Sequence, residues 1–299
     1  MDSMRVRSSM WLVSTLLNYG ELSLKDLSEL WREHTRLSKG ESLSRLQLNR
    51  AIAAAYKTFG VVIECDRRNK YRYHIVADEN LRAVEWLVSS QAITQGVNGS
   101  VSVRNRILLE EIPSGQHHLS SIIEAMTREK ALEMTYQKFA DSEPYVCYVE
   151  PYCVKLANQR WYLLGCKDHR ELLQVFALDR IKQLRVLFDH DFVLPSDFSP
   201  RQYFENALGV YAGPNIQPEI VTLRANLFWT NYLRTLPLHP SQQIVEQQDD
   251  YSIFSYYLGV TPDLLNRLLT FGDGIEVIEP QSLRQQLFQV ISNIYNKYK

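Results

Sequence analysis

The sequence predicts an α+β protein of several domains, because three different patterns follow one another along its 299 residues. Residues 1–77 combine helical apolar spacing with a hairpin, residues 118–190 contain closely spaced short strands, and residues 205–299 alternate strands with helices. A content of 45% apolar and 22% charged residues is ordinary for a globular protein, and this length is sufficient for two or three compact domains.

Three helices are expected in the first domain. Apolar residues with helical spacing occupy residues 11–17, and Gly20 supplies a stop signal. Ser23 and Asp26 have the spacing of a capping box, which predicts the start of a second helix. A third helix is predicted by four apolar residues on one face: Leu48, Ile52, Ala55 and Phe59.

A hairpin with a basic tip is expected after the third helix. Residues 61–65 and 71–75 read as strands, and Asp66-Arg67-Arg68-Asn69-Lys70 separates them. Three helices followed by such a ribbon are typical of a winged helix-turn-helix, whose third helix enters the major groove while the hairpin lies along phosphates. The charge distribution agrees, because residues 1–75 contain thirteen Lys or Arg and eight Asp or Glu, whereas the whole chain has a net charge of -1.

Candidate DNA-binding residues follow from side-chain chemistry. Arg, Gln and Asn side chains carry the donors and acceptors that distinguish base edges, and basic side chains on the hairpin attract phosphates of any sequence. The candidates are Arg45, Gln47, Asn49, Arg50, Lys57, Arg67, Arg68 and Lys70. The alternative is a solvated helix and hairpin that bind protein or no partner.

Residues 78–117 are expected to form a helical linker. Residues 80–95 and 103–111 have helical patterns, and Asn98-Gly99-Ser100 separates them. Connecting helices of this kind commonly form a dimer, and helix-turn-helix proteins usually read two half-sites as dimers. An ordinary linker is the alternative.

The middle of the chain predicts a small barrel or a strongly bent sheet. A helix at 119–128 is followed by short strands at 131–139, 145–150, 152–157, 160–166 and 172–186. Turn signals such as Ser142-Glu143-Pro144 and Asn158-Gln159 separate them.

Three motifs in this region resemble those of a known family. They are Pro151-Tyr152, Arg160-Trp161-Tyr162-Leu163 and Phe176-Ala177-Leu178-Asp179-Arg180-Ile181. In this order and spacing they resemble the WYL domain, a small Sm/SH3-like β-barrel of bacterial transcription regulators. The resemblance extends to FGVVIECDRRNKYRYHI, and PLHPSQQIV and FGDGIEVIEPQSLRQQL look like the C-terminal extension domain that accompanies WYL domains. The whole arrangement is similar to that of repressors associated with bacterial anti-phage defence islands.

This resemblance implies that a basic and aromatic surface of the barrel binds a nucleotide or oligonucleotide effector, which changes DNA binding. The positions that match are Tyr136, Lys138, Tyr152, Arg160, Tyr162, Gln174 and Arg180. Gln174 stands where the family usually has an arginine, so phosphate affinity is expected to be lower at that point. A barrel that only dimerises is the alternative.

Strand alternation separates the three residues of the central motif. Arg160 and Tyr162 are expected on one face and Trp161 on the other. Trp161 is therefore expected to pack in the barrel core, while Arg160 and Tyr162 are available for phosphate binding and for stacking.

The last domain is expected to have a split βαβ, ferredoxin-like pattern. Its expected strands and helices lie at 220–224, 227–236, 243–247, 252–260, 262–271, 275–278 and 280–297. Phe271-Gly272-Asp273-Gly274 is only a weak candidate for a phosphate loop.

No catalytic residue, metal or cofactor is expected. The sequence contains no G-x-x-x-x-G-K-[ST], G-x-S-x-G or H-E-x-x-H motif, and its four cysteines form no C-x-x-C pair. Asp189-His190-Asp191 is expected in a solvated turn, and His117-His118 could bind metal only with further partners. A cytoplasmic location is expected, because no secretory signal and no apolar run of roughly 20 residues is found.

Taken together, these features predict a homodimeric, sequence-specific regulator of transcription, expected to be a repressor that binds an inverted repeat in double-stranded DNA. One alternative is a nucleic-acid-binding accessory subunit without ligand control. An enzyme that acts on nucleotides is a further alternative.

Overall fold

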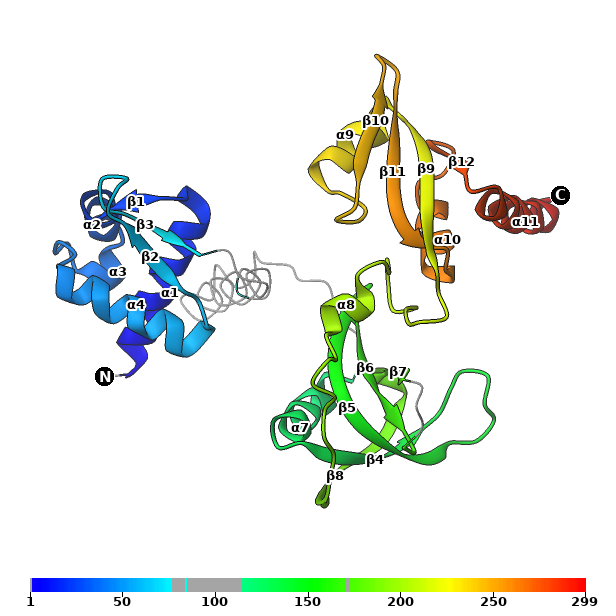
Figure 1. Ribbon diagram of the computed structural model, residues 1–299, viewed down its shortest axis with the longest axis horizontal. Coiled ribbons are helices and arrows are strands. Elements are labelled where there is room, and N and C mark those ends of the chain that lie inside the picture. Colours follow the sequence, from blue (N-terminus) through cyan, green and yellow to red (C-terminus); the bar gives the residue numbers. More distant parts are fainter. Residues whose placement is uncertain (1, 77–83, 85–114, 170–172) are drawn as a thin grey trace. The chain divides into compact units, whose positions relative to one another are not determined.

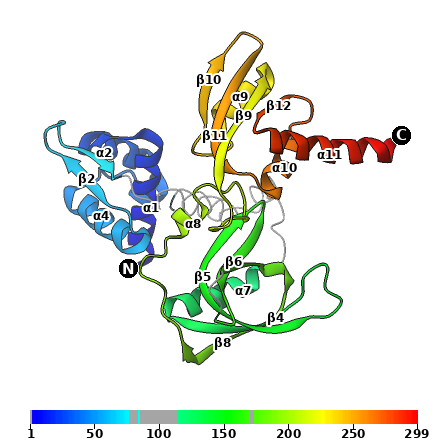
Figure 2. The same ribbon diagram turned by 45° about the vertical axis from the view of Figure 1, so that its right-hand side comes forward.

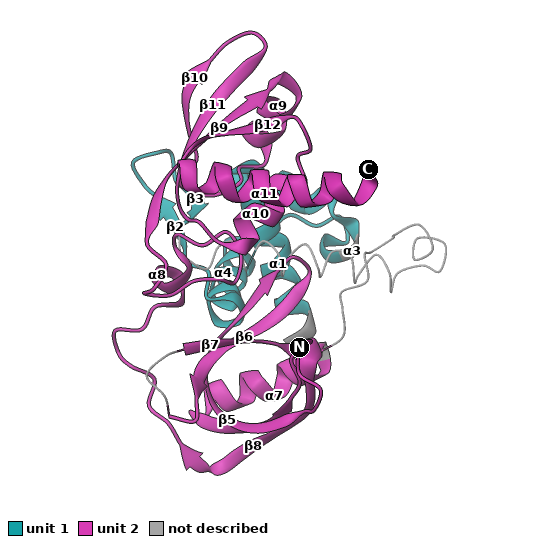
Figure 3. Cartoon of the chain, turned by 90° about the vertical axis from the view of Figure 1, so that its right-hand side faces the viewer, with its two compact units in different colours: residues 1–110 teal, residues 111–299 magenta. Residues whose placement is uncertain are grey.

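The computed structural model describes residues 2–76, 84, 115–169 and 173–299 (Figure 1). The chain divides into two compact units, residues 1–110 and 111–299 (Figure 3). Both helices that the sequence predicts for the linker, at 80–95 and 103–111, lie outside the described residues except for the helical residue Val84.

Unit 1 contains short helices and a small antiparallel sheet. Its elements are α1 (Asp2–Tyr19), β1 (Leu22–Ser23), α2 (Leu24–Glu33), α3 (Thr35–Ser38), α4 (Arg45–Phe59), β2 (Ile63–Asp66) and β3 (Arg72–Ile75). The strand order is β1-β3-β2, so β3 pairs with both neighbours. The three expected helices and the hairpin are present, and α3 is an additional single turn in what the sequence suggests is a loop.

Local hydrogen bonds define the helix ends of unit 1. The Ser23 Oγ accepts from the Asp26 N–H at 3.2 Å, and the Asp26 carboxylate accepts from the Ser23 N–H at 2.9 Å. This confirms the capping box predicted for α2. At the other end of α4, Gly60 adopts φ of 69°, the left-handed conformation that glycine tolerates best and that stops a helix.

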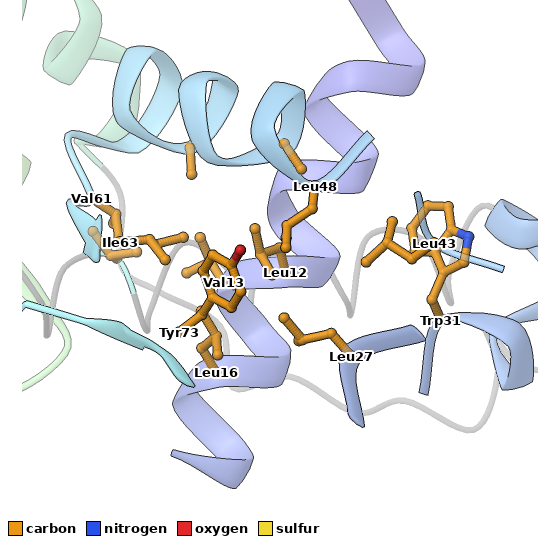
Figure 4. Packing of buried hydrophobic residues seen from close by; sticks show 13 residues of the cluster. Leu12, Val13, Leu16, Leu27, Trp31, Leu43, Leu48, Val61, Ile63 and Tyr73 are labelled. Carbon is orange, nitrogen blue, oxygen red and sulfur yellow. The ribbon is translucent and has the colours of Figure 1, made fainter. Parts of the chain in front are cut away.

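The core of unit 1 lies between α1, α2, α4 and the hairpin (Figure 4). Leu12, Leu27 and Leu48 come from three helices and are fully buried. Removing one such side chain from water contributes roughly 1.5–3 kcal/mol, so this small domain depends on a few apolar contacts. Because Leu48, Ala51 and Ala55 turn inward, the opposite half of α4 faces solvent.

The first part of unit 2 is a bent antiparallel sheet of five strands with one helix (Figure 2). Its elements are α7 (Gln116–Thr127), β4 (Lys130–Tyr136), β5 (Tyr145–Ala157), β6 (Arg160–Lys167), β7 (Leu173–Ala177), η1 (Leu178–Arg180) and β8 (Ile181–Asp191). The strand order is β7-β6-β5-β4-β8. Ile122 and Ala125 of α7 are fully buried in the core that the helix shares with the sheet.

The structure corrects three details of this region. The strands expected at 145–150 and 152–157 form the single strand β5, because a bulge between Pro151 and Cys153 accommodates the proline, which lacks an N–H group. The strand expected at 172–186 is interrupted by the 3-10 turn η1. Asp189-His190-Asp191 ends strand β8 and is exposed there, so it is not a separate turn.

The second part of unit 2 follows α8 (Pro200–Phe204). Its elements are β9 (Pro218–Asn226), α9 (Leu227–Thr235), β10 (Gln243–Gln247), β11 (Tyr251–Gly259), α10 (Pro262–Leu269), β12 (Ile275–Glu279) and α11 (Gln281–Tyr298). All pairs in the sheet are antiparallel, and the order is β10-β11-β9-β12. This order and the alternation of strands with helices agree with the split βαβ pattern expected from the sequence.

Candidate nucleic-acid interface and barrel surface

The exposed face of α4 is the first candidate surface. Asn49, Arg50, Ala53 and Lys57 lie at helical spacing opposite the buried leucine and alanine positions, and all four are exposed. Helix α4 contains no Asp or Glu. Since Ala53 is small, the centre of this face can approach a flat or grooved partner closely.

The basic and amide side chains of this face are free of internal partners. Among the described residues, the side chains of Arg45, Asn49, Arg50 and Lys57 make no hydrogen bond or ion pair. These side chains can therefore bind an external partner without first breaking a hydrogen bond or ion pair to another described residue. This is the property expected of side chains that read base edges or contact phosphates.

Gln47 has a different role from its neighbours. Its Oε1 accepts hydrogen bonds from the N–H and from the Oγ–H of Ser44, both at 2.8 Å, while the Ser44 Oγ accepts from the Gln47 N–H at 3.2 Å. Gln47 is thus the third helical residue of a capping box that starts α4. Its side-chain oxygen stabilises the helix, which leaves only the amide N–H groups for a partner.

The tip of the β2–β3 hairpin presents Arg67, Arg68 and Lys70 to solvent. The hairpin is fixed to the end of α1 by Glu21, whose carboxylate accepts from the Asn69 amide and whose carbonyl accepts from the Arg72 guanidinium, both at 2.8 Å. Sequence reasoning did not identify this anchor, because Glu21 lies about fifty positions away. The anchor holds a basic tip of defined conformation beside the helices.

On the five-stranded sheet that corresponds to the expected barrel, Arg160 and Arg180 gather around one aromatic ring. The Arg180 Cζ lies 3.8 Å and the Arg160 Cζ 6.0 Å from the ring centroid of Phe139, which is 76% exposed. The Arg160 Nε also lies 3.3 Å from the Asp179 Oδ2. Sequence reasoning missed Phe139 and Asp179, and together these four residues form the barrel cluster.

One nitrogen of the barrel cluster lacks a partner. The Arg180 Nε is buried and has no hydrogen-bond acceptor among the described residues. Buried guanidinium N–H groups are nearly always hydrogen-bonded, and a water molecule or a ligand oxygen would satisfy this one. The Asp179 Oδ1 is likewise buried without a donor among the described residues. Arg160 differs, since Asp179 already compensates its charge.

Tyr136 does not belong to the ligand-facing set expected from the resemblance. It is 3% exposed, and its hydroxyl accepts from the Ala177 N–H at 3.1 Å. Its ring packs edge-on against Phe176 at 5.3 Å, and burial raises the pKa of its phenol. Strand β4 alternates inward at this position, so Tyr136 is a core residue that fixes the end of β7.

The central motif follows the alternation expected from the sequence. Trp161 is half-buried and packs against the barrel core, which confirms its expected packing role. Arg160 and Tyr162 point to the opposite face, where Tyr162 is opposite Lys155 on β5 and Ala177 on β7. Their contact with a ligand remains a prediction.

The other candidate residues make contacts of their own. Exposed Lys138 has its Nζ 6.0 Å from the Tyr145 ring centroid, a ring that Lys167 approaches to 4.4 Å. Tyr152 packs edge-on against Phe198 at 5.0 Å, in the segment after β8. Gln174 is half-buried in β7 opposite Gly165.

The histidines do not form a metal site. The His190 Nδ1 lies 3.0 Å from the Asp189 carboxylate, and the His169 Nδ1 lies 2.8 Å from the Glu150 carboxylate. Within residues 2–76, 84, 115–169 and 173–299, no group of three His, Cys, Asp or Glu side chains could hold a metal ion. His118 is near the Ile181 carbonyl at 3.3 Å, and burial lowers the pKa of its imidazole.

Comparisons with known proteins identify two domains. Residues 117–186 match the WYL domain and residues 216–295 match the WCX domain, and together these ranges span half of the chain. A search of curated proteins gives no match. Among the helices that the structure describes, none is long and apolar enough to cross a membrane.

Two solved structures show distant similarity. Proteasome accessory factor B/C (PafBC) of Arthrobacter aurescens is 19% identical with a TM-score of 0.33, over 95% of this chain and 46% of that one. The crystal structure of a CRISPR Cas-related protein is 10% identical with a TM-score of 0.39, over 98% of this chain and 84% of that one. This chain therefore spans about half the length of PafBC.

Proposed function

The chain belongs to the family of WYL-domain proteins that also carry a WCX domain, and we propose that it is a sequence-specific regulator of transcription that binds double-stranded DNA. The observation that carries this proposal is the exposed, acid-free face of α4, on which Asn49, Arg50 and Lys57 have no internal partner among the described residues.

In this proposal, residues 1–77 form a winged helix-turn-helix and α4 is the recognition helix. Arg50 and Asn49 lie on the outward face at adjacent positions and contact base edges, for which the guanidinium and the amide have suitable donors. Arg67, Arg68 and Lys70 at the hairpin tip contact phosphates. Gln47 acts mainly by keeping the start of α4 in place, because its oxygen is already bonded to Ser44.

The barrel, residues 118–190, is proposed to sense a nucleotide or oligonucleotide effector. The unpartnered Nε of Arg180 supports this assignment, since a phosphate oxygen would satisfy it. The exposed ring of Phe139 offers a face on which a base can stack. Arg160 would join by exchanging its Asp179 partner for the effector, and Gln174 would contribute no charge.

The remaining parts of the proposal concern assembly and regulation. We assign dimerisation to residues 78–117 and an inverted repeat as the operator, because two copies of a helix-turn-helix related by a twofold axis read two inverted half-sites. Residues 205–299 form the C-terminal extension. The proposed action is repression of a defence-associated operon in the cytoplasm.

A second function is favoured by one contact. The ion pair between Arg160 and Asp179 already neutralises one guanidinium of the barrel cluster. If Asp179 keeps Arg160 from a small effector, the chain would be an accessory subunit in which barrel and winged helix bind nucleic acid without effector control.

The proposal is tested by selecting duplexes from a random pool with the purified protein at fixed, near-physiological salt. Enrichment of an inverted repeat, with half-sites about one helical turn or a multiple apart, supports a dimeric regulator. Enrichment of no motif contradicts sequence-specific binding and favours the accessory subunit. Candidate nucleotides are then tested for their effect on the selected site.

A further inference from the structure

A cavity of about 580 Å³ lies in unit 1, where the first turns of α1 and α4 meet the end of α2 and the segment that follows it. Its size is within the range of small-molecule pockets, which is about 300–1,000 Å³. The proposed DNA contacts of the hairpin do not use it. The described lining combines an apolar floor with a basic rim.

The floor of the cavity is aromatic and aliphatic. Partly buried Trp11 lies edge to face with buried Trp31, their ring centroids 4.8 Å apart, and the buried side chains of Leu43 and Leu48 lie behind this surface. Figure 4 shows Trp31 and Leu43 together at one side of the core, and Leu48 beside Leu12 within it. Indole faces and edges favour contact with another aromatic ring, so the floor suits a planar apolar body.

The rim of the cavity is basic. Arg5, Arg7 and Arg50 line it, and among its described lining residues no side chain is acidic. None of these three guanidinium groups has an ion-pair partner among the residues that the structure describes. Three like charges around one hollow repel one another, and a bound anion would remove that repulsion.

From this combination we propose that the cavity binds a small aromatic carboxylate. Its ring system lies against Trp11, which Trp31 supports from the core, and its carboxylate accepts hydrogen bonds from the guanidinium groups at the rim. Arginine and carboxylate have matching planar geometry, which allows two parallel hydrogen bonds. An uncharged aromatic molecule would leave the guanidinium groups uncompensated, and inorganic phosphate would leave the apolar floor uncovered.

A consequence for DNA binding rests on the proposed function. Arg50 lines the cavity and also belongs to the outward face of α4. A carboxylate that holds the Arg50 guanidinium at the cavity withdraws it from the base edge. The ligand is therefore expected to lower affinity for the selected operator without contacting the barrel.

The test is calorimetric titration of the full chain with 2-naphthoate in the absence of DNA. Saturable binding is expected, with 2-naphthamide, the uncharged analogue, binding at least about tenfold more weakly. Arg7→Gln is expected to lower the naphthoate affinity about tenfold, since it removes one charged donor. Lys25→Gln is the matched control, because it removes one positive charge from an exposed position on α2. It is expected to leave naphthoate binding unchanged.

Three results would overturn the cavity assignment. They are the absence of naphthoate binding at millimolar concentration, equal binding of the amide, and displacement by an equal concentration of inorganic phosphate. The link to DNA is tested separately with the selected duplex. If naphthoate binds but DNA affinity does not change, the cavity assignment stands and only the shared use of Arg50 is refuted. If the protein binds no operator, the proposed function fails, but the calorimetric test of the cavity still applies.

Discussion

Replacing Arg50 by alanine tests the proposed recognition helix most directly. The Arg50 side chain is exposed on α4 and has no internal partner among the described residues, so its removal breaks no contact there. Folding stability is therefore expected to change by less than about 0.5 kcal/mol, the usual range for exposed positions. Alanine also favours a helix, so the backbone of α4 is retained.

The effect on DNA binding is expected to be large and specific. A guanidinium that reads a base contributes about 1–3 kcal/mol of discrimination, which corresponds to roughly a 5-fold to 150-fold loss of affinity on the selected operator. Binding to unrelated duplexes falls much less, so the ratio of specific to non-specific affinity falls as well.

The assay is titration of labelled operator and of a scrambled duplex at one fixed salt concentration. Arg185→Ala is the control, because it removes the same charge from an exposed position on β8, where the side chain pairs with Glu133. Equal weakening of both duplexes by Arg50→Ala would show that Arg50 contacts phosphate, and the assignment of α4 as the reading helix would then be wrong.

The remaining predictions concern the hairpin, the core and the barrel. Lys70→Asn is expected to weaken all duplexes alike and to lower the salt dependence by about one ion per protomer. Asparagine is chosen because Lys70 has φ of 52°, where alanine would add strain. An unchanged salt slope would exclude the hairpin from the interface. Leu48→Ala is expected to lower the free energy of unfolding of unit 1 by about 2–5 kcal/mol in denaturant unfolding, because Leu48 is fully buried. Leu46→Ala, on the exposed face of the same helix, is expected to lower it by about 0.5 kcal/mol or less. Equal effects would contradict the packing of α4. Burial raises the pKa of Tyr145 to about 12, so its folded state favours the neutral phenol, and stability is expected to fall as the pH rises above about 10, where the unfolded chain ionises first. Denaturant unfolding at about pH 9 and about pH 11 measures this: the wild type is expected to lose more stability between the two pH values than Tyr145→Phe, and an equal loss in both proteins would contradict the prediction.

Features whose interacting atoms are close along the chain could be predicted from the amino-acid sequence. Ser23 and Asp26 are three residues apart, and a capping box between them needs only a helix that starts there, so the box could be predicted and is present. The inward face of α4 follows from a repeat of 3.6 residues, and the alternation of Arg160, Trp161 and Tyr162 follows from a repeat of two. The matches to the WYL and WCX domains agree with the family resemblance for the same reason, since the motifs are short and local.

The tertiary structure decided what depends on residues far apart in sequence. The Tyr136 hydroxyl bonds to the backbone of Ala177, forty-one positions away, and this contact turns an expected ligand residue into a core residue. Arg160 pairs with Asp179 because the turn η1, which follows β7 and contains Asp179, lies beside the start of β6. Whether a charged side chain is paired or free depends on distances of a few ångströms between such elements, because Coulomb energy and hydrogen bonding act at that range. Local periodicity predicts on which face a side chain lies, and only the packing of strands and helices determines what it meets there.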